Sequence, residues 1–479
     1  MNIDLIIDEQ TLTQINRHHT SSSTETMAFA FAGLRKYGKK MRIFVQPDGV
    51  ILPAEDCYNY TAKTRVKLNK KVQAAIYNEF VQSESRVLIN SHSHPFSESG
   101  TDFSPTDDKD DIAQASYWQS MPMSDGKARF SLSLVFDQSS FSARLTHKGK
   151  FYPISRVQVL RHAQVDTLVP NNAIEKAKVF VPNNMFSRQQ AIIHESNIAN
   201  YKVGVVGAGG LGSILAENLV RLGVKKFTII DDDIVERSNL NRLQGCSKHD
   251  LYEYKVKVIK RNIEDITDQV ECHAITANLS SQNAIASLSS CDLIISCVDN
   301  DVARYEVNRL ATQYMIPFFD VATSVSVKNG EPNYLGRIFS CIPSQTSCME
   351  CFSKPILKFD EIIQATLSPT MLDNFRHRGY ITGDKKVEKA ISIYGLNQIA
   401  VGIMSLELVR FFNQQPLNRI TVFDNEGNKL SRLKAPEFFD PPRVHCPNCN
   451  LHLAAGTQLS LPVIKQPFAN TKAKEWLEL

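Results

Sequence analysis

Short runs of apolar residues alternate with amphipathic stretches along most of the chain. In the first third, the runs MRIFVQ, SRVLIN and FSLSLVF are typical of strands, and helix-like stretches separate them. From Tyr201 the order becomes strand, glycine-rich turn, helix and strand, which predicts a βαβ unit, and a second alternation follows through CHAIT and CDLIISCVD. Residues 392–412 predict a buried or amphipathic helix. The pattern as a whole predicts an α/β fold.

The pattern loosens around residues 165–184, where proline and asparagine interrupt the apolar runs, and this predicts a linker. We therefore expect a first domain over residues 1–160, a linker over 161–185, a second domain over 186–450 and a C-terminal tail over 451–479. The 479 residues are 43% hydrophobic and 22% charged, which is ample for packed cores and excludes a disordered tail protein.

The charge balance is nearly even, with 54 Lys and Arg residues against 50 Asp and Glu residues. A net charge of +4 without dense basic clusters gives no reason to expect nucleic acid as a partner. No run approaches the roughly 20 apolar residues of a membrane span, and the N-terminus lacks a basic region followed by an apolar stretch. We expect a cytoplasmic protein with no membrane partner.

The first candidate site lies in the segment LINSHSHPFSESGTDFSPTDDKDDIA. His92 and His94 stand two residues apart at the end of a predicted strand, so both imidazoles share one face, and Asp107 opens the next predicted helix. Two imidazoles and one carboxylate leave one tetrahedral position open, as in catalytic zinc sites. Glu25, at the start of an apolar segment, is the candidate general base. Ser104 and Asp107 also form a capping-box pattern, which needs no metal.

Together these positions resemble the JAMM (JAB/MPN) metalloprotease family, whose pattern is an upstream Glu, then His-x-His-Pro, then Ser-x-x-Asp. The matching residues are Glu25, His92, His94, Pro95, Ser104 and Asp107. The resemblance implies that the two histidines and Asp107 bind a catalytic zinc ion, that Glu25 moves the proton and that Ser104 stabilises the oxyanion. The length of the spacer leaves a choice between Asp107 and Asp108. Such domains resemble enzymes that hydrolyse the bond after the C-terminal Gly of ubiquitin-like proteins, deubiquitinases among them.

A second candidate site follows the first strand of the βαβ unit. Gly207, Gly209, Gly210 and Gly212 form a turn that opens a helix, which lets the backbone approach a phosphate at the helix N-terminus. Asp231 ends the next strand about twenty residues on, where it would accept a ribose hydroxyl. A dinucleotide-dependent oxidoreductase would share these features. An Asn and an Arg in the downstream segment DDDIVERSNLNRLQ favour the binding of a triphosphate.

This stretch resembles the ThiF/MoeB and ubiquitin-activating family of adenylating enzymes, with its signature Ser-Asn-Leu-x-Arg. The resemblance implies that Asp231 binds the ribose and that Asn239, Arg242 and Lys255 contact the phosphates. It also implies that Asp299 positions Mg²⁺ and that Arg188 reaches the ATP of a dimer partner. The implied reaction is adenylation, in which a carboxylate attacks the α-phosphate and pyrophosphate leaves. The family's Arg-Gln dipeptide is altered here to Arg242-Leu243-Gln244.

Four of the ten cysteines form two C-x-x-C pairs far apart in the sequence. Two such pairs, called zinc knuckles, supply the four thiolates of a structural zinc site. A redox motif needs only one pair, beside the start of a helix. The spacing resembles the structural zinc of the same adenylating family, with Cys348, Cys351, Cys446 and Cys449 as the ligands.

Many activating enzymes carry a catalytic cysteine between the two knuckles, but this chain has no cysteine between Cys351 and Cys446. Either the adenylate passes directly to a nucleophile of another protein, or a residue of this chain accepts the acyl group. The candidate acceptors are the hydroxyls of Ser392, Thr382 and Ser368 and, more remotely, the thiol of Cys341.

The combined hypothesis is a JAB/MPN-like α/β metalloprotease domain followed by a Rossmann-like ThiF-type adenylating domain with a structural zinc. Such a protein would use ATP and Mg²⁺ to adenylate a ubiquitin-like protein ending in Gly. It would use a catalytic zinc to trim the precursor or to remove conjugates, as in bacterial ubiquitin-like conjugation systems, some of them linked to antiphage defence. We expect a separate conjugating enzyme and a homodimer.

Three alternatives stay open. The chain could activate a sulfur-carrier protein for cofactor biosynthesis. It could be a non-catalytic scaffold that binds a ubiquitin-like protein, or a NAD-linked oxidoreductase.

Overall fold

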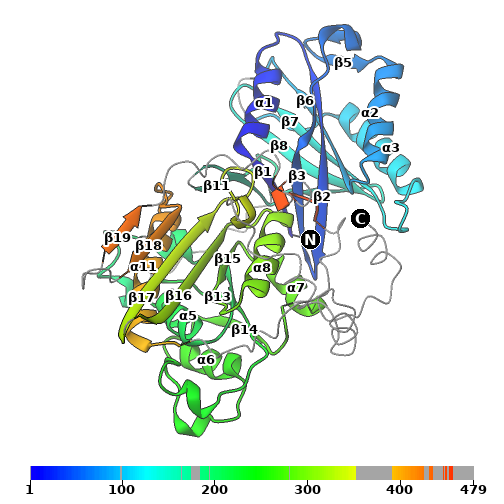
Figure 1. The fold of residues 1–479 in the computed structure, drawn as a ribbon. Coiled ribbons are helices and arrows are strands. Elements are labelled where there is room, and N and C mark those ends of the chain that lie inside the picture. The colour runs from blue at the N-terminus through cyan, green and yellow to red at the C-terminus, as the bar shows by residue number, and fades with distance from the viewer. Residues whose placement is uncertain are drawn as a thin grey trace, which may run out of the picture. The chain divides into compact units, whose positions relative to one another are not determined.

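The computed structural model describes residues 2–97, 100–162, 164–173, 184–193, 195–279, 281–328, 330–351, 391–424, 431–434, 446, 448–449 and 453–456. The chain forms two compact units. The first consists mainly of Met1–Val179 and the second mainly of Phe180–Ala311 and Ile316–Asn448, while Thr312–Met315 and Cys449–Leu459 cluster with the first. Figure 1 shows the elements of each unit.

The first unit is built on a nine-stranded sheet in the order β11-β10-β1-β3-β2-β6-β7-β8-β9. The strands are β1 (Asn2–Asp8), β2 (Met27–Tyr37), β3 (Lys40–Ile51), β6 (Val87–Ser93), β7 (Phe130–Phe136), β8 (Phe141–His147), β9 (Lys150–Pro153), β10 (Arg156–Leu160) and β11 (Val165–Leu168). A separate hairpin pairs β4 (Tyr58–Ala62) with β5 (Arg65–Leu68). The helices are α1 (Glu9–Thr20), α2 (Lys70–Gln82) and α3 (Pro105–Ser120), with the 3₁₀ turn η1 (Glu55–Cys57).

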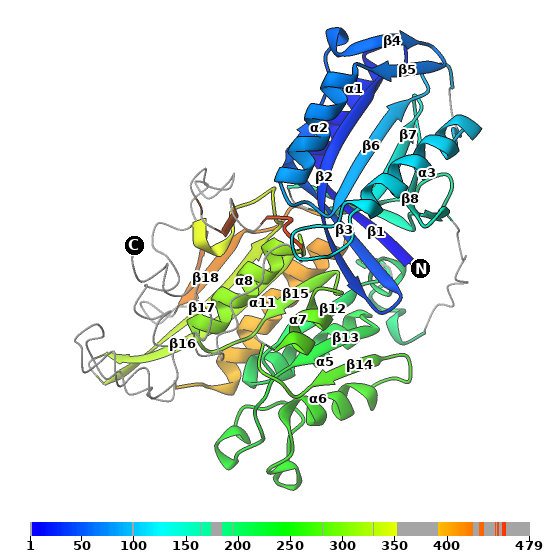
Figure 2. The same ribbon diagram turned by 90° about the vertical axis from the view of Figure 1, so that its right-hand side faces the viewer.

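Alternation along β2 divides the hydrophobic core of this unit into two layers. Ala28 and Ala30 belong to a core cluster that includes Ile15 of α1, whereas Phe29 and Phe31 belong to a second cluster with side chains from α2 and α3. Successive side chains of a strand point to opposite faces, so the sheet is covered by α1 on one face and by α2 and α3 on the other. Figure 2 labels strands β1, β2, β3, β6, β7 and β8 of this sheet and all three helices.

The second unit is built on an eight-stranded sheet in the order β14-β13-β12-β15-β16-β17-β18-β19. Its strands are β12 (Lys202–Val206), β13 (Lys226–Ile230), β14 (Glu271–Ile275), β15 (Leu293–Ser296), β16 (Phe318–Lys328), β17 (Glu331–Cys341), β18 (Ile420–Asp424) and β19 (Ser431–Lys434). Its helices are α4 (Glu195–Ile198), α5 (Gly210–Leu222), α6 (Lys255–Glu264), α7 (Gln282–Leu288), α8 (Asp301–Gln313) and α11 (Tyr394–Phe412). The 3₁₀ turns are η2 (Asn184–Phe186), η3 (Arg237–Asn239), η4 (Lys248–Asp250) and η5 (Met349–Cys351).

Strands β12 to β16 are parallel, and β17 to β19 add antiparallel neighbours. In chain order the parallel strands are arranged 3-2-1-4-5, so the direction of the strand order reverses between β12 and β15. This reversal is the topological switch point of a Rossmann-like sheet, where ligands bind at the carboxyl ends of the strands. The glycine-rich turn follows β12 and therefore lies at this point.

The predicted strands and helix named here are confirmed, but Val165–Leu168, in the segment predicted to be a linker, form strand β11. MRIFVQ lies in β3, SRVLIN overlaps β6, FSLSLVF is β7, and the predicted helix 392–412 is observed as α11. The apolar segment that Glu25 starts is observed as a strand, β2. Among the described residues, no helix combines the length and the apolar character that a membrane span requires.

Two glycines of the turn occupy positions that do not suit a residue with a side chain, one because of its backbone conformation and one because of lack of space. Gly207 has a φ of 94°, in the left-handed region. A Cβ on Gly212 would lie 1.9 Å from the carbonyl oxygen of Gly207, whereas a Cβ on Gly209 would meet nothing within 4 Å. Gly212 thus lets the first turn of α5 pack onto the turn that precedes it.

We expect Gly212→Ala to destabilise the second unit, because the new methyl group must displace backbone that has no room to move. The midpoint of thermal unfolding should fall by about 5 °C or more, and by less than about 2 °C in the matched control Gly209→Ala. Differential scanning calorimetry of both variants measures this. Equal midpoints for the two variants would contradict the close approach of Gly212 to Gly207.

Candidate functional site

The pairing of β2 with β6 brings Glu25 to the histidine pair. The two strands are antiparallel, with Met27 opposite His92. Continuing this register by two residues places Glu25 opposite His94. The N–H of Glu25 donates to the carbonyl oxygen of Ala62 at 2.8 Å, and the side chain of Glu25 is buried. The sheet thus brings together residues that are almost seventy positions apart in the sequence.

His92, His94 and Asp107 form one cluster whose donor atoms all lie within 4.8 Å of one another. The Nε2 atoms of the two imidazoles are 3.2 Å apart, and Nε2 of His92 is 3.3 Å from Oδ1 of Asp107. Ligands at about 2.0–2.1 Å from a tetrahedral zinc ion lie about 3.3 Å from one another. The spacing of these three side chains therefore fits a zinc ion.

The capping box and the predicted metal-ligand position, which the sequence offered as alternatives, are compatible at Asp107. Its Oδ2 accepts the N–H of Ser104 at 2.7 Å, and the hydroxyl of Ser104 accepts the N–H of Asp107 at 3.3 Å, which completes a capping box at the start of α3. Its other oxygen, Oδ1, faces His92. The cap thus fixes the carboxylate in the orientation that a metal ligand needs.

The choice between Asp107 and Asp108 is decided by Arg144. Asp108 accepts a hydrogen bond from Nη1 of Arg144 at 2.6 Å, and Arg144 also binds Asp111. Burial by itself would raise the pKa of Asp107, but hydrogen bonds and charge from His92, with hydrogen bonds from Ser104, hold that pKa well below its usual range. Asp107 is therefore the carboxylate of this cluster and is ionised at neutral pH.

Burial raises the pKa of Glu25 to about 7; the positive charge of His92 opposes this shift and the negative charge of Asp107 adds to it. A carboxyl group with a pKa near neutrality can both accept and return a proton at physiological pH. Glu25 therefore has the environment that a general base in this cluster requires.

Two supporting residues of this cluster were not anticipated from the sequence. Nδ1 of His94 lies 2.8 Å from Oγ1 of Thr101, and the N–H of Thr101 donates to Oδ2 of Asp137 at 3.0 Å. Outer residues of this kind fix the ring orientation of a ligating histidine. No motif marks them: Thr101 lies in the spacer before Ser104, and Asp137 follows a different strand, β7.

In the second unit, the glycine turn is linked directly to the predicted ribose acid. Oδ2 of Asp231 accepts the N–H of Ala208, inside the turn, at 2.6 Å. Burial raises the pKa of Asp231, while the N–H of Ala208 and the charge of Lys255 oppose the shift. Helix α5 begins at Gly210 and has no side-chain cap, so its first N–H groups are available to a phosphate.

Arg242 and Lys255 lie beside this turn. A Cβ on Gly210 would be 3.3 Å from Cγ of Arg242. The Nη1 group of Arg242 donates to the carbonyl oxygen of Ser238 at 2.6 Å. Lys255 is buried at the start of α6, and its ammonium group is 2.6 Å from Oδ2 of Asp233. Arg242 thus packs against the first residue of α5, and the charge of Lys255 acts on Asp231, whose carboxylate binds the turn.

The remaining predicted residues of this site differ in their surroundings. Asn239 is buried, and its Oδ1 accepts the N–H of Glu236 at 3.0 Å, which is a capping role. Asp299 is exposed beyond the end of β15, and its Oδ1 accepts a hydrogen bond from the side chain of Asn300. Arg188 is exposed in a turn before α4. A reach of Arg188 into a partner subunit stays a prediction.

Asn397, in α11, lies against the glycine turn, and the sequence did not reveal it. Its Nδ2 would lie 2.6 Å from a Cβ on Gly210 and donates to Oγ of Ser392 at 3.2 Å. Ser392 is therefore close to the turn. Thr382 and Ser368 lie outside the described residues, and Cys341 is buried.

The four predicted thiols come together and are all buried. Sγ of Cys348 is 3.8 Å from Sγ of Cys351 and 3.6 Å from Sγ of Cys446, and Cys449 completes the group within 4.8 Å. Thiolates at 2.3 Å from a tetrahedral zinc ion lie about 3.8 Å from one another, whereas disulfide-bonded sulfurs lie about 2.05 Å apart. The cluster therefore fits a zinc ion rather than a disulfide.

The carboxylates of Asp231, Asp232 and Asp233 form a further cluster, with oxygen atoms within 4.8 Å of one another. Asp231 is engaged by the turn and Asp233 by Lys255, so these side chains belong to the nucleotide site.

Comparison with known proteins gives a family match over most of the second unit and matches to single proteins. The sequence profile of the ThiF family matches residues 186–448. The chain is 34% identical over 155 residues to SUMO-activating enzyme subunit 2 of Dictyostelium discoideum, which covers 32% of this chain and 22% of that protein. It is 27% identical over 204 residues to ubiquitin-like modifier-activating enzyme 5 of Aedes aegypti, which covers 39% of this chain and 50% of that protein.

The chain thus spans between about a fifth and a half of the length of these curated relatives. Among solved structures, E. coli MccB with MccA-N7isoASN is 18% identical with a TM-score of 0.43, and the match covers 56% of this chain and 75% of that chain.

We expect the purified protein to carry two zinc ions per chain, one for each donor cluster. The double variant His92→Asn, His94→Asn should lose one of them, because a single carboxylate does not hold zinc, and Cys446→Ser should lose the other. Inductively coupled plasma mass spectrometry measures the content. His273→Asn and Cys57→Ser, which lie outside both clusters, serve as controls. Zinc content that is unaffected by removal of both histidines would exclude the first site.

Proposed function

Because this chain belongs to the ThiF family, we propose that it is an ATP-dependent adenylating enzyme that activates the C-terminal carboxylate of a ubiquitin-like protein. The match of the family profile to residues 186–448 carries this proposal. The names of the relatives, a SUMO-activating and a ubiquitin-like modifier-activating enzyme, support a protein substrate of the ubiquitin-like class. We further propose that the first unit is a JAMM-type zinc hydrolase that acts on the same protein.

In the adenylation step, an oxygen of the substrate carboxylate attacks the α-phosphorus of ATP while the bond to pyrophosphate breaks. The free N–H groups at the start of α5, with Arg242 and Lys255, would stabilise the negative charge that develops on the phosphates. Asp231 would accept the ribose hydroxyls, and Asp299 would hold Mg²⁺, which neutralises phosphate charge when bound. The product is an acyl-adenylate, a mixed anhydride open to attack by a nucleophile.

In the hydrolytic step, His92, His94 and Asp107 would hold zinc, which polarises the scissile carbonyl when bound. Glu25 would take a proton from the attacking water and return it to the leaving amine, which its pKa of about 7 permits. The hydroxyl of Ser104 already accepts the N–H of Asp107, so its own hydrogen is available to the oxyanion. The cut would trim a precursor or release a conjugate.

The four-thiolate cluster would hold a structural zinc ion and take no part in the chemistry. Thiolate ligands persist in a reducing compartment, which supports the cytoplasm as the location. A homodimer in which Arg188 reaches the ATP of the partner, and a separate conjugating enzyme, complete the proposal.

A second candidate is the activation of a sulfur-carrier protein for cofactor biosynthesis. One observation favours it: the sequence has no cysteine between Cys351 and Cys446 to accept the acyl group as a thioester. The adenylate would then pass to an external sulfur nucleophile. Formation of a thiocarboxylate on the carrier, rather than of a conjugate, would identify this alternative.

We expect exchange between pyrophosphate and ATP that depends on a ubiquitin-like protein ending in Gly. Lys255→Ala should lower the exchange rate by about 100-fold, because it removes a buried cation from the phosphate site. Lys257→Ala is the matched control, since this exposed lysine of the same helix pairs with Glu253, and it should keep the rate within about twofold. Equal rates for the two variants would remove Lys255 from the site.

We expect Glu25→Gln to abolish cleavage after the terminal Gly of the precursor while zinc content stays unchanged. Loss of a positioned general base lowers the rate by about 10²–10⁴-fold. Cleavage is followed by intact mass spectrometry, and Glu79→Gln, at an exposed position of α2, serves as the control. Full cleavage by a zinc-loaded Glu25→Gln protein would show that another group moves the proton.

A further inference from the structure

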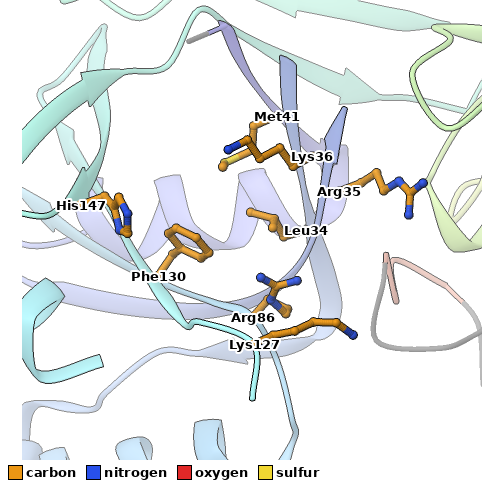
Figure 3. A pocket seen from close by; sticks show the side chains of 8 residues that line it. All are labelled: Leu34, Arg35, Lys36, Met41, Arg86, Lys127, Phe130 and His147. Carbon is orange, nitrogen blue, oxygen red and sulfur yellow. The ribbon is translucent and has the colours of Figure 1, made fainter. Parts of the chain in front are cut away.

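The first unit contains a cavity of about 270 Å³ that is separate from the histidine cluster. It is lined by Leu34, Arg35, Lys36, Met41, Arg86, Lys127, Phe130 and His147. These residues lie at or just beyond the ends of neighbouring strands, and Figure 3 shows their side chains. Strand β6 runs from Val87 to Ser93, so Arg86 and His92 lie at opposite ends of it, roughly 20 Å apart at about 3.3 Å per residue.

The lining of this cavity is strongly cationic. Four of its eight residues are Arg or Lys, and none is acidic. Arg35 points away from the other labelled side chains in Figure 3, which leaves Lys36, Arg86 and Lys127 as the cations of the cavity. Lys127 forms an ion pair with Asp125, an exposed acid next to the cavity. Burial lowers the pKa of His147, and the charges of Lys148 and Lys36 lower it further, as expected where the potential is positive.

One wall of the cavity is aromatic and held in place. The rings of Phe130 and His147 have centroids 5.2 Å apart. The guanidinium group of Arg86 lies 5.9 Å from the centroid of Phe130, and its Nε and Nη2 both donate to the carbonyl oxygen of Ala128 at 3.2 Å. Leu34 and Met41 are buried and close the cavity from the core side. The cavity is thus preformed, with an apolar wall and a cationic rim.

We propose that this cavity binds a small planar molecule that carries a phosphate, the class to which nucleoside monophosphates belong. Arg and Lys side chains bind phosphate oxygens, and an aromatic wall stacks on a planar ring. The volume lies just below the roughly 300–1,000 Å³ of drug-sized ligand sites, which favours one ring system with one phosphate over a dinucleotide. This binding site would be distinct from both proposed reaction sites, because neither of them shares a residue with the cavity.

AMP is the probe, measured by isothermal titration calorimetry on the full chain. All proteins carry Asp231→Ala, so that the nucleotide turn of the second unit does not contribute. We expect AMP to bind at least about tenfold more tightly than either adenosine or inorganic phosphate alone, because ring and phosphate both contribute. Lys36→Glu should weaken AMP binding by about tenfold or more, since it places a like charge beside the phosphate. The matched control Lys39→Glu, at an exposed position outside the cavity, should leave it unchanged.

Phe130→Leu provides a second arm that does not depend on charge. It should weaken AMP binding but leave the weaker binding of phosphate unchanged, since only the ring loses its partner. Heat-unfolding midpoints of the variants establish that they are folded. The proposal is overturned if AMP does not bind, if adenosine or phosphate binds as tightly as AMP, or if Lys36→Glu and Lys39→Glu have the same effect.

Discussion

The antiparallel register of β2 against β6 is the constraint on which the candidate zinc site depends. Two hydrogen bonds fix that register beside the site itself: the N–H of Ser93 donates to the carbonyl oxygen of Thr26 at 3.2 Å, and the N–H of Thr26 donates to Oγ of Ser93 at 3.1 Å. A slip of one residue would turn every β2 side chain to the opposite face and carry Glu25 away from the histidines. Ala28 and Phe29 pack into different cores, on opposite faces of the sheet, and this opposes such a slip. The packing of the unit therefore keeps Glu25 beside the histidines.

In the second unit, strand pairing likewise positions the polar groups at the end of β12. The glycine turn lies at the switch point of the sheet, and Asp231, from the end of the neighbouring strand β13, accepts the N–H of Ala208 within that turn. The absence of a side chain at Gly212 lets α5 start directly against the turn. In both units, therefore, strand pairing sets the positions of the polar groups, and a local backbone feature orients them: the capping box of Asp107 in one unit and the glycine turn in the other.

The main strands, the histidine pair and the two thiol knuckles could be predicted because each has a local signature in period, spacing or residue type. Thr101 could not be predicted, because no local pattern marks the residue of the loop that turns back to His94. Asp137 and Asn397 could not, because their contacts with Thr101 and Gly210 arise only when distant segments fold together. The choice of Asp107 over Asp108 also required the fold, since Arg144 comes from another strand, β8. The cationic cavity had no signature at all, because single residues from several strand ends compose it.

Pyrophosphate release with an extended precursor tests most directly whether both units act on the C-terminus of one ubiquitin-like protein. A precursor with residues beyond its terminal Gly offers no Gly carboxylate to the nucleotide turn until those residues are removed. We expect the wild-type chain with zinc, ATP and Mg²⁺ to release pyrophosphate with this precursor. We expect Glu25→Gln to release pyrophosphate only with the protein already trimmed to Gly. Pyrophosphate release with the extended precursor by Glu25→Gln, or none with the trimmed protein by the wild type, would contradict an action of both units on one protein.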